Sequence, residues 1–208
     1  MVQLQADNIG KRFGKRVLFR KLSHNFAGGT ATAVTGINGS GKSTLIRILA
    51  GVLSPGKGSV LLDVDGVAID QDQHSLRVGL VAPYLNLYDD FSPSENLQFL
   101  ARARGYDAVP QRIDALMDRI GLPQRKNDLL STFSSGMKQR IRIAAALFSD
   151  PAVLLLDEPG SNLDEAGIEL VKSVVADAIG RGKVVIVATN DEREVSMCSS
   201  RVYLGDYL

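Results

Sequence analysis

The sequence is poor in the residues that build disulfides and soft-metal centres. It has one cysteine, Cys198, and two histidines, His24 and His74, which lie far apart in the chain. A single cysteine excludes an internal disulfide and a cysteine-rich metal site, and the separated histidines argue against a histidine cluster. We therefore expect a protein of a reduced compartment, the cytoplasm.

Long apolar runs and an excess of one charge are also missing. No apolar run approaches the roughly 18 residues needed to span a bilayer, and the N-terminus lacks the regions of a signal peptide. The 24 Lys and Arg against 23 Asp and Glu give a formal net charge of +1, so no global attraction to nucleic acid arises, although a local patch stays open. No basic arm or long insertion is visible, and no nucleic acid partner is expected. The chain has 208 residues and is 45% hydrophobic, which suffices for one or two globular domains.

The stretch from Gly36 to Ser43 fits the phosphate-binding pattern G-x-x-x-x-G-K-[ST]. It follows an apolar run, Thr30 to Thr35, that predicts a strand, and it precedes a segment with helical apolar spacing. Glycines let such a loop curl so that its backbone N–H groups face a phosphate, and the helix N-terminus adds its dipole. The predicted phosphate-binding residues are Gly36, Asn38, Gly39, Ser40, Gly41, Lys42, Ser43 and Thr44.

Two carboxylates follow a second apolar strand, residues 153 to 156. Ligand groups sit at the carboxyl ends of buried parallel strands, so we expect Asp157 to hold Mg²⁺ together with the hydroxyl of Ser43. Glu158 would orient or deprotonate an attacking water, and Lys42 would stabilise charge on the transferring phosphoryl group. The alternative is a solvated turn, which the upstream phosphate loop makes the weaker interpretation.

A further helix start, Ser134-Ser135-Gly136, is followed by Lys138 and Arg140. A helix N-terminus of this kind can bind an anion, and it is also an ordinary serine-capped helix. Residues 85 to 148 are helical in pattern, whereas the flanks alternate strands and helices. This predicts a single α/β domain over 1–208, with a mainly parallel core from 1–84 and 149–208 and an inserted helical subdomain.

Local patterns predict several other elements. Residues 58–63 and 67–69 form a hairpin about Asp65-Gly66, residues 70–75 an exposed loop, and residues 201–208 a final strand. Helices are predicted from Val109 to Ile120 and from Asp191 to Met197.

Together these motifs resemble the ATP-binding subunit of ATP-binding-cassette (ABC) transporters over essentially the whole chain. Gly36–Ser43 is similar to Walker A, and Val153–Glu158 is similar to Walker B with its catalytic glutamate. Phe133–Met137 stands where the family has its L-S-G-G-Q signature, and Ser161–Asp164 resembles the D-loop. Phe13 stands where an aromatic ring stacks on adenine in that family, and the alternative is a core aromatic at a strand edge.

The resemblance implies a P-loop NTPase core with an N-terminal antiparallel β subdomain, and a head-to-tail dimer, with homodimer and heterodimer both open. ATP would be gripped by Walker A of one subunit and by Ser134, Ser135 and Gly136 of the other. The helical insertion would dock on an integral membrane transporter subunit, which places the chain at the cytoplasmic face of the membrane. The short chain resembles the small haem-exporter-type ATPases.

Two departures from the family pattern matter more than those at Ser135 and Met137 in the signature. Tyr84 stands where the Q-loop has glutamine, and Asn190 stands where the family has its switch histidine. Asn190 can still donate to a γ-phosphate oxygen, but it cannot become a cation. We therefore expect slow turnover, and two alternatives stay open: a soluble ABC-type ATPase switch without a membrane partner, and a nucleotide-gated module with weak turnover.

Overall fold

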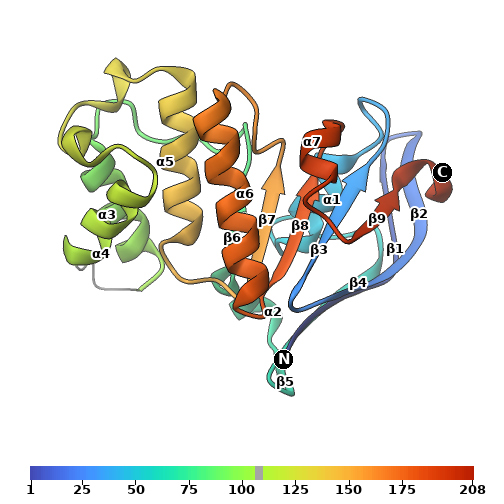
Figure 1. Ribbon diagram of the computed structural model, residues 1–208. Coiled ribbons are helices and arrows are strands. Elements are labelled where there is room, and N and C mark those ends of the chain that lie inside the picture. The colour runs from blue at the N-terminus through green and yellow to red at the C-terminus, as the bar shows by residue number, and fades with distance from the viewer. Residues whose placement is uncertain (106–109) are drawn as a thin grey trace.

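The computed structural model describes residues 1–105 and 110–208, and its strands form two sheets (Figure 1). One sheet is antiparallel and has the strand order β2–β1–β4–β5. Its strands are β1 (Val2–Phe13), β2 (Arg16–Ala27), β4 (Lys57–Val64) and β5 (Val67–Ile69). The hairpin predicted about Asp65-Gly66 is confirmed, because β4 and β5 pair through that turn.

The second sheet is parallel and has the order β6–β7–β8–β3–β9. Its strands are β6 (Val78–Val81), β7 (Val153–Asp157), β8 (Val184–Ala188), β3 (Thr30–Thr35) and β9 (Ser200–Tyr203). Strands β3 and β7 are far apart in sequence, yet they lie on either side of β8. In the register of the sheet, Asp157 pairs with Ala188 and Ala188 pairs with Val34, so the ends of all three strands lie level.

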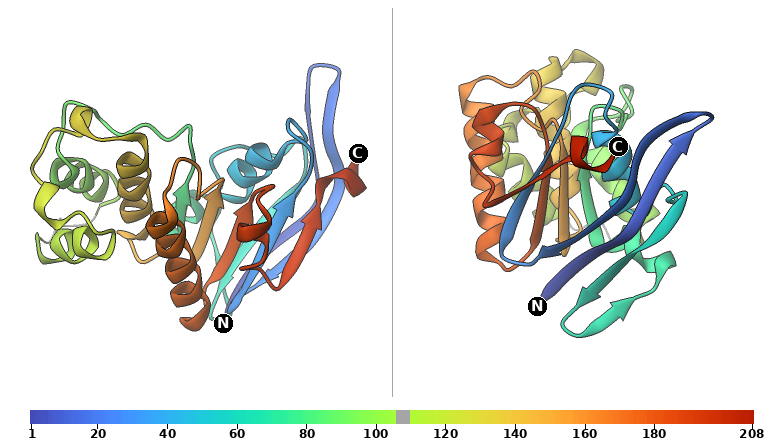
Figure 2. Two further views of the ribbon diagram at one scale, coloured as in Figure 1. Left: turned by 45° about the horizontal axis from the view of Figure 1, so that its top comes forward. Right: turned by 90° about the vertical axis from the view of Figure 1, so that its right-hand side faces the viewer.

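Helices cover both faces of the parallel sheet (Figures 1 and 2). The helices are α1 (Lys42–Leu49), α2 (Gln71–His74), α3 (Pro93–Ala103), α4 (Pro110–Arg119), α5 (Ser135–Leu147), α6 (Glu165–Gly180) and α7 (Glu192–Val195). Strand β7 explains this arrangement, because successive strand side chains point to opposite faces. Val153 and Leu155 pack in one core with α1, whereas Leu154 and Leu156 pack in another with α6. The predicted α/β fold with an antiparallel N-terminal sheet is confirmed.

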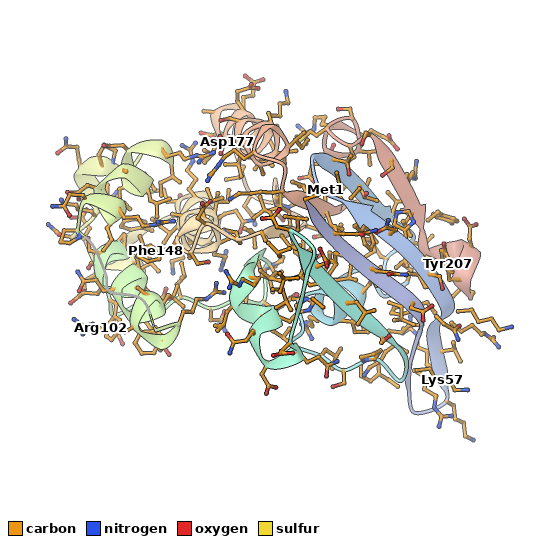
Figure 3. The ribbon with its side chains drawn as sticks, turned by 90° about the horizontal axis from the view of Figure 1, so that it is seen from below. Met1, Lys57, Arg102, Phe148, Asp177 and Tyr207 are labelled. Carbon is orange, nitrogen blue, oxygen red and sulfur yellow. The ribbon has the colours of Figure 1, made fainter. Side chains whose placement is uncertain are left out.

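The helical part has a core of its own, which joins α3, α4 and α5 through Leu97, Met117 and Ile141. Figure 3 shows this part, with Arg102 and Phe148, at one end of the molecule and the antiparallel sheet with Lys57 at the other. Helix α3 begins with a capping box, in which the Ser92 hydroxyl accepts from the N–H of Glu95. Among the described residues, no helix has the length and apolar character required to cross a membrane.

The prediction of an exposed loop over residues 70–75 is confirmed only in part, because residues 70–73 are exposed but the segment is not a loop. This segment contains α2 and the start of a 3₁₀ turn, Ser75–Arg77. His74 is buried, and its Nε2 lies 2.8 Å from the backbone oxygen of Leu49. A helix of one turn has no apolar periodicity to reveal it, and the contact that fixes it comes from another part of the chain.

The predicted strand over 201–208 is also corrected. Strand β9 ends at Tyr203, and a 3₁₀ helix, Leu204–Tyr207, follows it. The helix predicted over Asp191–Met197 is shorter, since α7 ends at Val195. The helix predicted from Val109 is α4, and Val109 itself lies outside the described residues.

Candidate functional site

The phosphate loop connects the end of β3 to the start of α1, as the sequence predicts. Gly36 and Gly41 have φ of +153° and +105°, a region that favours glycine. A Cβ on Gly36 would lie 2.7 Å from the Ser40 Oγ, so the loop has no room for a side chain there. The residue that precedes α1 is Gly41, and no side chain caps the helix. Its first N–H groups are therefore available to an anion.

Lys42 lies within this loop rather than in solvent. Its side chain is only 6% exposed, and its Nζ donates to the backbone oxygen of Gly36 over 2.8 Å. The Ser40 Oγ is buried and has no hydrogen-bond partner among the described residues. A buried donor without a partner is costly, so this cradle suits a bound phosphate oxygen.

Asp157 ends β7 and is buried beside the loop. It is 1% exposed, and neither of its carboxylate oxygens has a hydrogen-bond partner in the described parts of the chain. Burial raises its pKa first of all, and the charge of Glu158 adds to this, while Ser43, Lys42 and Arg47 act in the opposite direction. A buried carboxylate with free lone pairs near a hydroxyl fits a hard divalent cation such as Mg²⁺.

Glu158 lies at the turn that follows Asp157, and its side chain is exposed. Its φ is +49°, a left-handed conformation that residues other than glycine adopt rarely. Its backbone N–H donates to the oxygen of Ala188 over 2.9 Å, which ties the turn to the end of β8. The carboxylate is thus free to meet water next to the metal candidate.

Asn190 follows β8 and reaches the phosphate loop. Its Nδ2 donates to the Asn38 Oδ1 over 3.1 Å, so these two predicted site residues are in direct contact. Arg16 also contacts the loop, because its Nη2 donates to the oxygen of Gly39 over 2.8 Å. Arg16 is not among the predicted site residues, although it belongs to a basic segment, residues 11–16, in the sequence. A cavity of about 200 Å³ lies here, lined by Arg16, Ile37 and Tyr203 among others.

Tyr84 lies near the metal candidate and stacks against a cation. The guanidinium carbon of Arg47 is 3.8 Å from the centre of its ring. The Tyr84 hydroxyl is buried without a hydrogen-bond partner in the described structure. Burial raises its pKa, and so does the nearby charge of Asp157, although Arg47 lowers it. The ring therefore packs against α1 at the position of the family's Q-loop glutamine.

Phe13 lies near the tip of the β1–β2 hairpin and is 54% exposed. The alternative that Phe13 is a core aromatic is therefore wrong. The Lys11 Nζ is 5.5 Å from the centre of its ring, which leaves the ring available for stacking. The phosphate loop and the two carboxylates follow strands of the parallel sheet, whereas Phe13 belongs to strand β1 of the antiparallel sheet.

Ser134, Ser135 and Gly136 are the predicted site residues that do not meet the phosphate loop. Ser134 caps α5 and accepts from the N–H of Met137 over 3.2 Å. Helix α5 packs through Ile143 and Ala146 in the same core as α6, on the face of the parallel sheet opposite to α1. A Cβ on Gly136 would lie 2.7 Å from the Asn162 oxygen, so the helix start packs on the loop after β7. In the described structure, no hydrogen bond links these residues to the phosphate loop of their own chain.

Replacing Asp157 with Asn is expected to stabilise the metal-free protein by about 1–3 kcal/mol at neutral pH, because it removes a charge whose cost of burial outweighs its contact with the Ser43 hydroxyl. The pKa of Asp157 is raised on folding, so the wild-type protein loses this part of its stability as pH rises through the folded pKa. Urea unfolding between pH 4 and 8 measures both effects. Asp177→Asn, an exposed carboxylate, is the control. Equal stability of Asp157→Asn and wild type at all pH values would contradict this account.

The sequence model of the ABC transporter family matches residues 19–161. "Uncharacterized ABC transporter ATP-binding protein YybJ" of Bacillus subtilis (strain 168) is 32% identical over 197 residues, which cover 94% of this chain and 89% of the relative. "Nod factor export ATP-binding protein I" of Cupriavidus metallidurans is 31% identical over 98% of this chain and 68% of the relative. "Linearmycin resistance ATP-binding protein LnrL" of Bacillus subtilis is 29% identical over 98% and 66%.

Solved structures share the fold. A putative ABC transporter ATP-binding protein from Pyrococcus furiosus has a TM-score of 0.83 at 19% identity, over 99% of this chain and 98% of that one. A dimeric ATP-binding cassette, solved in a post-hydrolysis state bound to ADP and Pi, has a TM-score of 0.81 at 24% identity over 96% and 93%.

Proposed function

The chain belongs to the ABC transporter family, and on that premise we propose that its phosphate loop and paired carboxylates bind ATP with Mg²⁺ and hydrolyse ATP to ADP and phosphate. The observation that carries this proposal is the register of the parallel sheet. Asp157 lies level with Ala188 and Val34, so the carboxylates and the loop that follows β3 meet at one edge. The buried, unpartnered oxygens of Asp157 support a cation at that edge.

Each residue of the site has a role that its position supports. Lys42 stabilises negative charge on the transferring phosphoryl group, and the loop N–H groups hold the neighbouring oxygens. Ser43 and Asp157 hold Mg²⁺, which supplies positive charge to the phosphate oxygens when it is bound. Glu158 accepts a proton from the attacking water. Asn190, which is in contact with the loop, donates to the γ-phosphate, and the exposed ring of Phe13 stacks on adenine.

A second ATP-binding subunit completes the site. Ser134, Ser135 and Gly136 lie at the start of α5, which begins on the side of the molecule where the parallel strands end (Figure 1). The N-terminus of α5 has the dipole and free N–H groups that bind a γ-phosphate. A head-to-tail dimer would place this helix start opposite the loop of the other subunit, so ATP binding closes the dimer and hydrolysis opens it.

The membrane partner docks between the helical part and the α/β core. A groove of about 360 Å³ lies there, lined by apolar side chains that include Val52, Leu76, Leu85 and Leu87. Beside it, Tyr88 packs on Phe91 and Phe99 in an exposed aromatic group. Exposed apolar surface of this kind marks an interaction site. Two relatives are named for export and for resistance, and we propose that this chain likewise serves a membrane-spanning transporter from its cytoplasmic face.

Phosphate release from ATP by the purified protein, with Mg²⁺ or with EDTA, tests the enzymatic part of the proposal. We expect release that depends on Mg²⁺ and saturates with ATP. ATP binding without any Mg²⁺-dependent release, alone or with its co-purified partners, would favour the second candidate, a nucleotide-gated module. Tyr84 and Asn190 are the observations that favour that candidate, while Glu158 argues against it. A soluble ABC-type switch would release phosphate but would have no membrane partner.

Replacing Asn190 with His is expected to raise turnover roughly tenfold, because an imidazolium forms a charge-assisted hydrogen bond about twice as strong as that of a neutral amide. The gain should shrink as pH rises above about 6.5, where histidine loses its charge. Steady-state phosphate release between pH 6 and 8 measures it, with Asn190→Ala as the control. The expectation of slow turnover rests on Tyr84 and Asn190. An unaltered rate in Asn190→His would leave Tyr84 as its only basis.

A further inference from the structure

The turn that carries Glu158 is held in an uncommon conformation. Glu158 has a φ of +49°, which a residue with a side chain keeps only when its surroundings impose it. The residues around the turn must therefore fix it from outside. Because Glu158 has to face a water molecule at a defined angle, whatever holds this turn also sets the geometry of proton transfer.

Three different elements contact the backbone of this turn. The end of β8 accepts from the Glu158 N–H at 2.9 Å, and Gln139 of α5 donates its Nε2 to the Pro159 oxygen at 3.0 Å. From α7, the Glu194 Oε1 accepts from the Gly160 N–H at 2.6 Å. The last contact is the shortest of the three, and it uses a carboxylate as acceptor.

Glu194 is an unusual residue for the position it occupies. It is only 2% exposed, and its Oε2 is buried without a hydrogen-bond partner in the described residues. A buried carboxylate is costly, so a structural helix would carry an apolar residue here. The packing is also close, since a Cβ on Gly160 would lie 2.4 Å from the Glu194 Oε1. The free-energy cost of burying this carboxylate and its close packing on Gly160 both indicate that Glu194 has a specific role.

We propose that Glu194 is a positioning residue that holds the turn of Glu158 in its catalytic conformation through the N–H of Gly160. The inference rests on the proposed function, in which Glu158 accepts the proton of the attacking water. Helix α7 begins two residues after Asn190, whose side chain contacts Asn38 of the phosphate loop. Glu194 thus links the turn of the general base to the segment that faces the nucleotide.

Two substitutions separate this role from packing. Glu194→Gln keeps an acceptor oxygen for the Gly160 N–H, and its kcat is expected to stay within about threefold of wild type. Glu194→Leu removes the acceptor, and its kcat is expected to fall about 100-fold with ATP affinity unchanged, because the base is misplaced. A third variant, Gly160→Ala, displaces the Glu194 oxygen and also the Ile168 side chain, and its kcat should fall at least as far as that of Glu194→Leu. Glu192→Leu, an exposed glutamate of the same helix, is the matched control.

A double-mutant cycle distinguishes positioning of Glu158 from a merely structural role. It compares the loss of turnover that Glu194→Leu causes with and without the Glu158 carboxylate. In a Glu158→Gln background the base is already absent, so adding Glu194→Leu should lower the residual turnover by less than about threefold. The proposal would be overturned if the losses in turnover from Glu158→Gln and Glu194→Leu were fully additive. It would also be overturned if folded Glu194→Leu and Gly160→Ala had the kcat of wild type. If Glu158→Gln itself leaves turnover unaltered, the proposed function fails rather than the role of Glu194 alone.

Discussion

Replacing Glu158 with Gln is expected to lower ATP turnover by roughly 10²- to 10⁴-fold, because the amide cannot accept a proton from water. Glutamine has nearly the same shape, and Lys42, Ser43 and Asp157 remain in place, so ATP affinity should persist. Phosphate release and fluorescent-nucleotide binding measure the two quantities. With binding intact and hydrolysis blocked, the variant should accumulate as an ATP-bound dimer, which light scattering detects.

The control for this substitution is Glu192→Gln, since Glu192 is an exposed glutamate on α7 away from the turn. It should hydrolyse ATP at the wild-type rate. A Glu158→Gln protein that is as active as wild type would contradict the assignment of the general base. Loss of both binding and turnover would indicate a disturbed turn instead of a missing proton acceptor.

Replacing Lys42 with Ala is expected to weaken ATP binding by about 10- to 150-fold, because hydrogen bonds from a charged donor contribute about 1.5–3 kcal/mol. The Lys42 Nζ is buried in the loop and already positioned by the Gly36 oxygen, so little ordering is needed on binding. Equilibrium titration with a fluorescent ATP analogue measures the change. Turnover should fall as well, since the charge on the phosphoryl group loses its partner.

Lys172→Ala provides the control for charge, because Lys172 is exposed on α6 and pairs only with Glu169 in the described structure. Its ATP affinity should match wild type. Thermal unfolding of both variants excludes general damage to the fold. Wild-type affinity in a folded Lys42→Ala protein would show that the loop does not bind the phosphates through this side chain.

The sequence predicts the nucleotide site well because its signals are local. The glycine spacing around Lys42 and the apolar run before Asp157 each lie within a few residues, and each element forms where the pattern predicts it. The meeting of these two segments follows from the rule that parallel strands share their carboxyl edge. The register of β3, β8 and β7 places them level.

Features that depend on long-range packing were not predictable. Glu194 accepts from Gly160, which is 34 residues away in the chain. Gln139 donates to Pro159, which is 20 residues away. Helix α2 is one turn long, and the contact of its His74 with Leu49 spans 25 residues. No local pattern encodes such pairs, because they arise only when the elements pack. The resemblance to small haem-exporter-type ATPases stays a prediction, since none of the relatives described above bears that name.

The measurement that tests the account most directly is purification of the tagged chain from its native cell in a gentle detergent, with phosphate release measured on the isolated assembly. We expect a polytopic membrane protein in stoichiometric amount and Mg²⁺-dependent hydrolysis that Glu158→Gln abolishes in the same assembly. A soluble companion, or the chain alone with full ATPase activity, would contradict the transport role and favour a cytosolic ATPase switch.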